Sequence, residues 1–144
     1  MTDKELCLTA AAARRRAYAP YSRFAVGAAL LTETGKVFTG ANIENAAFTP
    51  TICAERVAFF RALSEGERRF SAIAICGGQI GEKGEKTAPC GVCRQVMREF
   101  CTPDFRILLT DEQGFFDEYP LSSLLPLSFG PQTLKKGEKK DADV

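Results

Sequence analysis

Apolar residues follow a helical spacing in some segments of this chain and form short continuous runs in others. The residues Thr2-Asp3-Lys4-Glu5 have the form of a capping box, and the apolar positions after them predict a helix that ends before Pro20. The same spacing predicts helices over 53–65 and 90–100. In the first of these two, the spacing puts Val57, Ala58 and Phe60 on the apolar side.

Five apolar runs between these helices predict β-strands, at 24–32, 37–42, 70–76, 107–110 and 115–119. Short turn segments join the first two strands and the last two, so each of these pairs is expected to be antiparallel. The remaining connections, including the glycine- and charge-rich segment 77–87, are expected to be loops. The order α-β-β-α-β-α-β-β predicts an α/β fold with three layers, α/β/α, around a mixed five-stranded sheet.

Length and composition indicate one soluble domain. The chain has 144 residues, and we expect a single domain over 1–134 followed by a charged, disordered tail over 135–144. The net charge is only +1, and the one dense basic run is Arg14-Arg15-Arg16, which argues against nucleic-acid binding. We expect this run to be a solvated helix face. A poor signal peptide and the lack of a membrane-length apolar run predict a cytoplasmic protein without a membrane partner.

Two clusters of cysteine stand out because the chain has no histidine. Cys53 begins one predicted helix, and Cys90 and Cys93 begin another with the spacing of metal ligands. Helix N-termini favour thiolates, so the three sulfurs are expected to hold one zinc ion per chain. Three ligands leave a fourth position open for water, as in catalytic zinc sites.

A structural site closed by a fourth cysteine is the alternative. Its candidates are Cys7, Cys76 and Cys101, each of which stands alone and is expected to be a small buried hydrophobe. An iron–sulfur cluster is less favoured because it usually needs four thiolates.

The two residues after Ala54 have the charges that such a site needs. Without histidine, Glu55 is the nearby group that can carry a proton between water and substrate, although a first-turn carboxylate also simply favours the helix dipole. Three thiolates and Zn²⁺ sum to a charge of −1. Arg56 is a candidate donor that offsets it, or else a solvated helix charge.

Several motifs in one order resemble the cytidine deaminases of the small, homotetrameric, three-cysteine zinc type. They cover roughly residues 5 to 131: Tyr18-Ala19-Pro20-Tyr21-Ser22, Phe24-Ala25-Val26-Gly27-Ala28-Ala29-Leu30, Asn42-Ile43-Glu44-Asn45-Ala46-Ala47, Cys53-Ala54-Glu55, Pro89-Cys90-Gly91-Val92-Cys93 and Phe129-Gly130-Pro131.

The resemblance implies hydrolytic deamination of cytidine and 2′-deoxycytidine, with release of ammonia, in pyrimidine salvage. Zinc on the three cysteines would activate the water that attacks C4, and Glu55 would shuttle protons. Arg56 would donate to the zinc-bound sulfurs.

The resemblance also implies the substrate contacts. The Ala54 backbone would hold the base, and Phe24 would pack against base or sugar. Asn42 and Glu44 would bind the ribose hydroxyls, Glu44 mainly the 3′-hydroxyl. Phe129 would enter a neighbouring subunit's active site in a homotetramer. Taken singly, Phe24 could equally be a core residue, and Asn42 and Glu44 could be turn residues.

Three other functions are weighed against this one. A deaminase of a modified cytosine nucleoside, such as blasticidin S, is the alternative within the same chemistry. A polynucleotide deaminase is disfavoured by the near-neutral charge, and a non-catalytic zinc module would use the same cysteines without Glu55.

Overall fold

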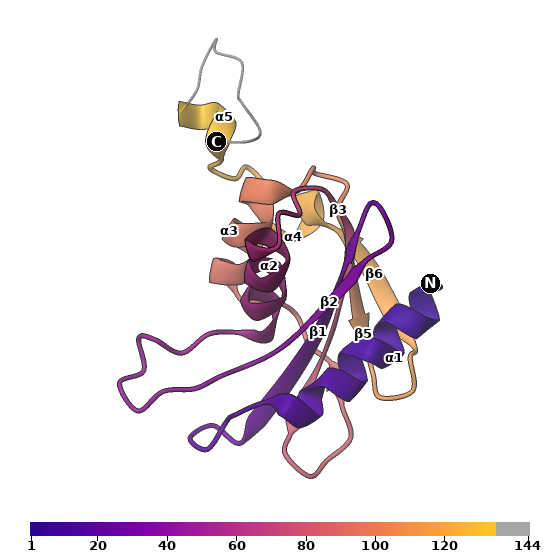
Figure 1. Ribbon diagram of the computed structural model, residues 1–144, viewed down its shortest axis with the longest axis vertical. Helices are drawn as coiled ribbons and strands as arrows, with labels where there is room; N and C mark the ends of the chain where they lie inside the picture. The colour runs from indigo at the N-terminus through magenta and orange to yellow at the C-terminus, as the bar shows by residue number, and fades with distance from the viewer. Residues whose placement is uncertain (135–144) are drawn as a thin grey trace.

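The computed structural model describes residues 1–134, and the predicted tail at 135–144 lies outside the described residues (Figure 1). The order of the eight predicted helices and strands is confirmed, with shorter elements added between and after them. In chain order the elements are α1 (Asp3–Ala13), the 3-10 turn η1 (Arg14–Arg16), β1 (Phe24–Thr32), β2 (Val37–Ala41), α2 (Ala54–Ser64), β3 (Phe70–Gln79), β4 (Glu85–Lys86), α3 (Gly91–Phe100), β5 (Arg106–Thr110), β6 (Phe116–Pro120), α4 (Leu121–Leu124) and α5 (Pro131–Leu134).

The sheet is mixed, as predicted. It has six strands where five were predicted: β2-β1-β3-β5-β6 lie in this order, and the short β4 pairs with β3. Strands β3 and β5 are parallel, and the other neighbours are antiparallel. The prediction of a plain loop over 77–87 is wrong in part. Strand β3 continues to Gln79, and Glu85 and Lys86 return as β4 to pair with Gly77 and Cys76. Glycine and charged residues concealed this short hairpin from the apolar pattern.

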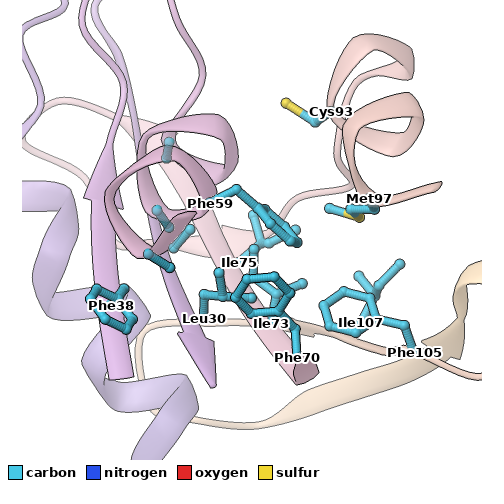
Figure 2. Close-up of a cluster of buried hydrophobic side chains, with 14 of the residues drawn as sticks. Leu30, Phe38, Phe59, Phe70, Ile73, Ile75, Cys93, Met97, Phe105 and Ile107 are labelled. Carbon is cyan, nitrogen blue, oxygen red and sulfur yellow. The ribbon is translucent and has the colours of Figure 1, made fainter. Parts of the chain in front are cut away.

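Helices cover both faces of the sheet, which confirms the three layers. Helix α1 lies on one face and α2 and α3 on the other (Figure 1). Alternate residues of the central strands serve the two faces. The strand residues that face α2 and α3 are large: Leu30, Ile73, Ile75 and Ile107. Those that face α1 are mostly alanine: Ala29, Ala72, Ala74 and Leu108. Figure 2 shows the first set with Phe59 of α2 and with Met97 and Cys93 of α3.

The predicted apolar side of α2, with Val57, Ala58 and Phe60, is confirmed for Ala58 and wrong for Phe60. The buried residues of the helix are Ala54, Glu55, Ala58, Phe59 and Ala62, whereas Phe60 is 44% exposed. Phe59 packs edge-on against Phe70, with ring centroids 5.2 Å apart. The buried carboxyl group of Glu55 interrupts the apolar stripe, and this is why the pattern pointed to Phe60.

Two glycines let the helices approach the sheet closely. A Cβ on Gly40 of β2 would lie 2.3 Å from the Ala54 carbonyl oxygen and 2.6 Å from the Ala58 nitrogen. A Cβ on Gly27 of β1 would lie 2.1 Å from the Ala10 carbonyl oxygen. The first turn of α2 is therefore seated directly on β2.

The expectation that Arg14-Arg15-Arg16 is a solvated helix face is wrong for Arg14. Its side chain is buried and donates to the carbonyl oxygens of Ala25, Gly78, Gln79 and Glu82 and to the Glu112 carboxylate. A guanidinium has five donors in a fixed fork, which suits this set of acceptors from three segments. The capping box is confirmed, because Thr2 and Glu5 exchange hydrogen bonds of 3.1 and 2.7 Å. Within residues 1–134, no helix has the length and apolarity that a bilayer crossing requires.

Candidate metal centre and active site

The three candidate zinc ligands lie at the N-terminal ends of two helices. Cys53 is the N-cap residue of α2, and Cys90 is the N-cap residue of α3, with Cys93 in the first turn of the same helix. Neither N-cap cysteine makes a side-chain capping hydrogen bond. Both sulfurs are therefore available to bind a metal ion, and each lies next to the partial positive charge of a helix N-terminus.

The sulfur positions fit a tetrahedral zinc ion. Cys53 Sγ lies 3.7 Å from Cys90 Sγ, and Cys90 Sγ lies 3.6 Å from Cys93 Sγ. Zn–S bonds of about 2.3 Å at tetrahedral angles place sulfurs about 3.8 Å apart. All three sulfurs lie within 4.8 Å of one another, and among residues 1–134 no fourth cysteine joins the group. This geometry supports a site with three protein ligands over the closed four-thiolate alternative.

Of the remaining cysteines, Cys7 and Cys76 are fully buried, as predicted. Burial raises the pKa of Cys76 to about 11, as expected for an inert thiol. Cys101 is half-buried and packs against the core cluster beneath α3.

The thiols of the cluster differ in acidity in the metal-free chain. The hydrogen bond with Cys93 lowers the pKa of Cys53 to about 5, with further help from Arg56 and Cys90. The same hydrogen bond and burial raise the pKa of Cys93. The two sulfurs thus share a proton that zinc binding must displace, since zinc takes cysteine as thiolate.

Arg56 is directed at the cluster. Its Nη2 donates to Cys53 Sγ over 3.3 Å, and its buried Nε has no partner among the described residues. A solvated helix charge would neither donate to a cysteine sulfur nor bury its Nε. The guanidinium is placed to offset the negative charge that three thiolates leave on a zinc complex.

Glu55 is buried beside the cluster, with 3% of its surface exposed. Burial raises the pKa of its carboxyl group to about 7, and the charge of Cys53 acts in the same direction. A carboxyl with this pKa takes up and releases protons near neutral pH. Arg56 and Glu55 are neighbours in sequence but have different surroundings. The Arg56 side chain contacts a sulfur of the cluster, and Glu55 lines the cavity.

A cavity of about 340 Å³ opens in front of these groups. Its lining combines residues of β1, the segment 42–44, the start of α2 and the segment before α3: Ser22, Phe24, Val26, Asn42, Glu44, Thr51, Ile52, Cys53, Ala54, Glu55, Thr87, Ala88 and Cys90. Every predicted substrate-contact residue except Phe129 lies on this wall.

The side chains of Asn42 and Glu44 are both hydrogen-bonded to the segment 21–26 of the same chain. The Asn42 amide accepts from Val26 N over 2.8 Å and donates to the Phe24 carbonyl over 2.9 Å. Glu44 accepts from the backbone nitrogens of Tyr21 and Ser22 and from the Ser22 hydroxyl, which together lower its pKa. Both side chains are fixed on the cavity wall with some hydrogen-bonding capacity left.

Phe129 stands apart from this cavity. Its side chain is 56% exposed, and its carbonyl accepts from Gln95 of α3. The structure therefore does not bring Phe129 to the site of its own chain.

Comparison with known proteins gives this arrangement a family. Residues 1–109 match the model of the cytidine and deoxycytidylate deaminase zinc-binding region, which spans more than half of the chain and all three cysteines. The chain belongs to the cytidine deaminase family. Its cysteine triad places it in the small three-cysteine zinc type of that family.

Relatives of similar length support this assignment. The cytidine deaminase of Sporosarcina psychrophila is 44% identical over 134 residues, covering 93% of this chain and 96% of that protein. That of Halalkalibacterium halodurans is 48% identical over 129 residues, covering 90% and 95%. The crystal structure of the Burkholderia pseudomallei cytidine deaminase superposes with a TM-score of 0.81 at 49% identity, covering 90% of this chain and all of that one.

As a cytidine deaminase family member, the chain is a zinc-binding hydrolase whose α/β fold matches the solved structures of the family. The motif analysis missed the remaining lining residues as candidate site residues: Ser22, Val26, Thr51, Ile52, Thr87 and Ala88. Ser22 was within reach, because it ends the quoted motif 18–22. Thr87 was hidden by the composition of the loop that contains it.

Proposed function

We propose that this chain catalyses the hydrolytic deamination of cytidine and 2′-deoxycytidine to uridine and 2′-deoxyuridine, with release of ammonia. The observation that carries the proposal is the buried carboxyl of Glu55 beside three sulfurs spaced for zinc, at the wall of a cavity of about 340 Å³. A cavity of this size suits a small-molecule ligand.

Cys53, Cys90 and Cys93 would hold one zinc ion per chain. When bound, zinc would supply the Lewis acidity that makes water a nucleophile near neutral pH. The chain's own part is to balance the charge: the N-termini of α2 and α3 and the donation from Arg56 offset the third thiolate.

Glu55 would move the protons of the reaction. It takes a proton from the attacking water and gives it to N3 of the pyrimidine. It then takes the remaining proton of the added hydroxyl and delivers it to the departing amine. Its pKa of about 7 suits both steps, because neither protonation state is strongly favoured at neutral pH.

The rest of the cavity wall would hold the nucleoside. The first turn of α2 offers the Ala54 backbone to the base, Phe24 packs against base or sugar, and Asn42 and Glu44 bind the ribose hydroxyls. Asn and Glu two positions apart point the same way from an extended segment. The near-neutral charge of the chain supports free nucleosides over a polynucleotide.

Phe129 would complete the site of a neighbouring subunit in a homotetramer. Two observations support this: the ring is exposed on its own chain, and it lies outside its own cavity. Other large apolar side chains are exposed as well, among them Phe48 and Leu127, which subunit contacts would cover. A reducing cytoplasm, where thiolates persist, is the compartment that fits such a site.

The decisive experiment compares the zinc-loaded parent with Glu55→Gln on cytidine, 2′-deoxycytidine and blasticidin S. We expect the parent to deaminate both nucleosides, and the variant to keep its zinc and its fold while losing at least about a thousandfold in kcat, since it cannot transfer protons. A zinc-loaded parent active only on blasticidin S would support the alternative substrate. A variant as active as the parent would refute the role of Glu55.

A further inference from the structure

The Ser22 hydroxyl joins two parts of the cavity wall that the mechanism uses separately. Its Oγ donates to Glu44 Oε2 and accepts from Phe24 N over 3.0 Å. Glu44 comes from the segment after β2, and Phe24 begins β1. One hydroxyl therefore fixes a carboxylate and the start of a strand relative to each other, and its own side chain lines the same cavity.

The hydrogen bonds of Glu44 leave little freedom to its carboxylate. Oε1 accepts from Tyr21 N and Ser22 N, over 3.0 and 3.1 Å. Oε2 accepts from the Ser22 hydroxyl and keeps one lone pair for a ligand. An ionised carboxylate accepts hydrogen bonds and donates none, so the group that meets this lone pair must itself be a donor.

The turn that presents Ser22 is anchored on both sides. Tyr18 pairs with the segment of Glu44, through Tyr18 N to the Asn42 carbonyl at 2.9 Å and Glu44 N to the Tyr18 carbonyl at 2.8 Å. Arg23 has φ of +62°, a left-handed conformation that a non-glycine residue adopts at some cost, and its nitrogen donates to the Ala19 carbonyl. Hydrogen bonds on both sides therefore fix the conformation of the turn that carries Ser22.

We propose that Ser22 is a positioning residue that makes the enzyme specific for nucleosides with a free 3′-hydroxyl. The inference rests on the proposed role of Glu44 in binding that hydroxyl. Ser22 and the two backbone donors aim the last lone pair of Glu44 at the sugar, where a hydroxyl donates to it. A 3′-phosphate, which brings negative charge to an ionised carboxylate, is rejected.

The test is a comparison of kcat/KM for cytidine and 3′-deoxycytidine in zinc-loaded parent, Ser22→Ala and Ser22→Thr. The parent should prefer cytidine. Ser22→Ala should reduce that preference about tenfold, mostly through KM for cytidine, and change turnover of 3′-deoxycytidine less than about twofold. Ser22→Thr, which keeps the hydroxyl, should retain most of the preference. In parallel, the pKa of Glu44 followed by carboxyl NMR should rise in Ser22→Ala and not in Ser22→Thr.

The outcomes separate this inference from the function on which it rests. An equal loss on both nucleosides in Ser22→Ala means that Ser22 only supports β1, and overturns the inference alone. A parent that deaminates both nucleosides equally well removes the sugar role of Glu44 together with that of Ser22. A zinc-loaded parent that turns over neither nucleoside overturns the proposed function itself.

Discussion

At the scale of single residues, the site depends on how charge is balanced around three sulfurs. The pKa of the Cys53 thiol is lowered to about 5, first by its hydrogen bond with Cys93, and Arg56 is a further donor to it from the same helix. Glu55, between Cys53 and Arg56 in sequence, has its carboxyl pKa raised to about 7 by burial. The first turn of α2 therefore supplies a ligand, a proton carrier and a counter-charge.

Replacing Arg56 with Gln removes this counter-charge. We expect zinc affinity, measured by competition with a chromophoric chelator, to fall about 10- to 100-fold, as is usual when a group that hydrogen-bonds a metal ligand is lost. Arg61→Gln is the matched control, because Arg61 lies in the last turn of the same helix and donates to Thr39 instead. Equal zinc affinity in parent and Arg56→Gln would show that the helix termini alone balance the charge.

Sequence predicts such residues only when their task follows from their own chemistry. Cysteines at ligand spacing and the neighbouring Glu55 were recognisable because the chain lacks histidine. Arg14 was not, since it acts through backbone groups that only the folded chain brings near it. A run of three arginines gives no sign that one of them is buried.

At the scale of elements, the position of α2 on the sheet determines the geometry of the site. Gly40 of β2 allows the first turn of α2, and with it Cys53 and Glu55, to lie against the strand. Gly40→Ala should push this turn outward. We expect a loss of about 1–3 kcal/mol in unfolding free energy by urea titration and a fall in kcat/KM of at least about tenfold.

The same substitution at Gly91 serves as the comparison. Gly91 lies in the first turn of α3, and a Cβ there would meet nothing within 4 Å. Gly91→Ala should leave the fold as stable or up to about 1 kcal/mol more stable, because alanine favours the helix. If Gly40→Ala behaves in the same way as Gly91→Ala, close packing of α2 on β2 is not required.

Strand β5 is tied to its neighbours by Arg106, which gives a prediction about pH. Arg106 donates to both carboxylate oxygens of Glu118 on β6, at 2.8 and 2.9 Å, and to Asp3 of α1. These donations lower the pKa of Glu118 below its ordinary value of 4.5. A lowered carboxyl pKa adds stability that is fully present above the unfolded-state value and is lost as the pH falls through the folded-state value.

Arg106→Gln should therefore cost less than about 1 kcal/mol at pH 7, because the groups are more than a third exposed. The difference in unfolding free energy between parent and variant should shrink as the pH falls below about 4.5. Urea titrations at pH 7 and pH 4 measure it, with Lys36→Gln, which removes the exposed lysine of the pair with Glu67, as the control. A difference that grows at low pH would contradict the assigned sign.

At the scale of the whole molecule, the zinc site joins two helices whose ligands are 37 positions apart in sequence. A bound ion would act as a cross-link between the elements on one face of the sheet. Removal of zinc by a chelator should lower the melting temperature by at least about 5 °C, since one kcal/mol corresponds to a few degrees in a domain of this size. Zinc added back should restore it and magnesium should not. If metal analysis shows that all zinc has been removed and the melting temperature is unchanged, the cross-link is refuted.

The layer architecture was predictable because alternation along the strands and helical spacing are properties of the local sequence. The strand order, with β3 parallel to β5 between antiparallel neighbours, was not predicted, because the sequence pattern gives the order of elements along the chain and not their order in the sheet. The pairing of β4 and the burial of Phe59 rather than Phe60 on α2 were not predictable, because a polar or glycine-rich stretch hid each of them.

The close spacing of the three sulfurs has a consequence for redox chemistry. Cys90-Gly91-Val92-Cys93 is a Cys-x-x-Cys dithiol at a helix start, with its two sulfurs 3.6 Å apart, and oxidation joins such a pair into a disulfide. Bound zinc would occupy the lone pairs that an oxidant attacks, so loss of the ion exposes the site to disulfide formation. Chelation in air then combines two events, and only chelation under a reducing agent reports the loss of metal by itself.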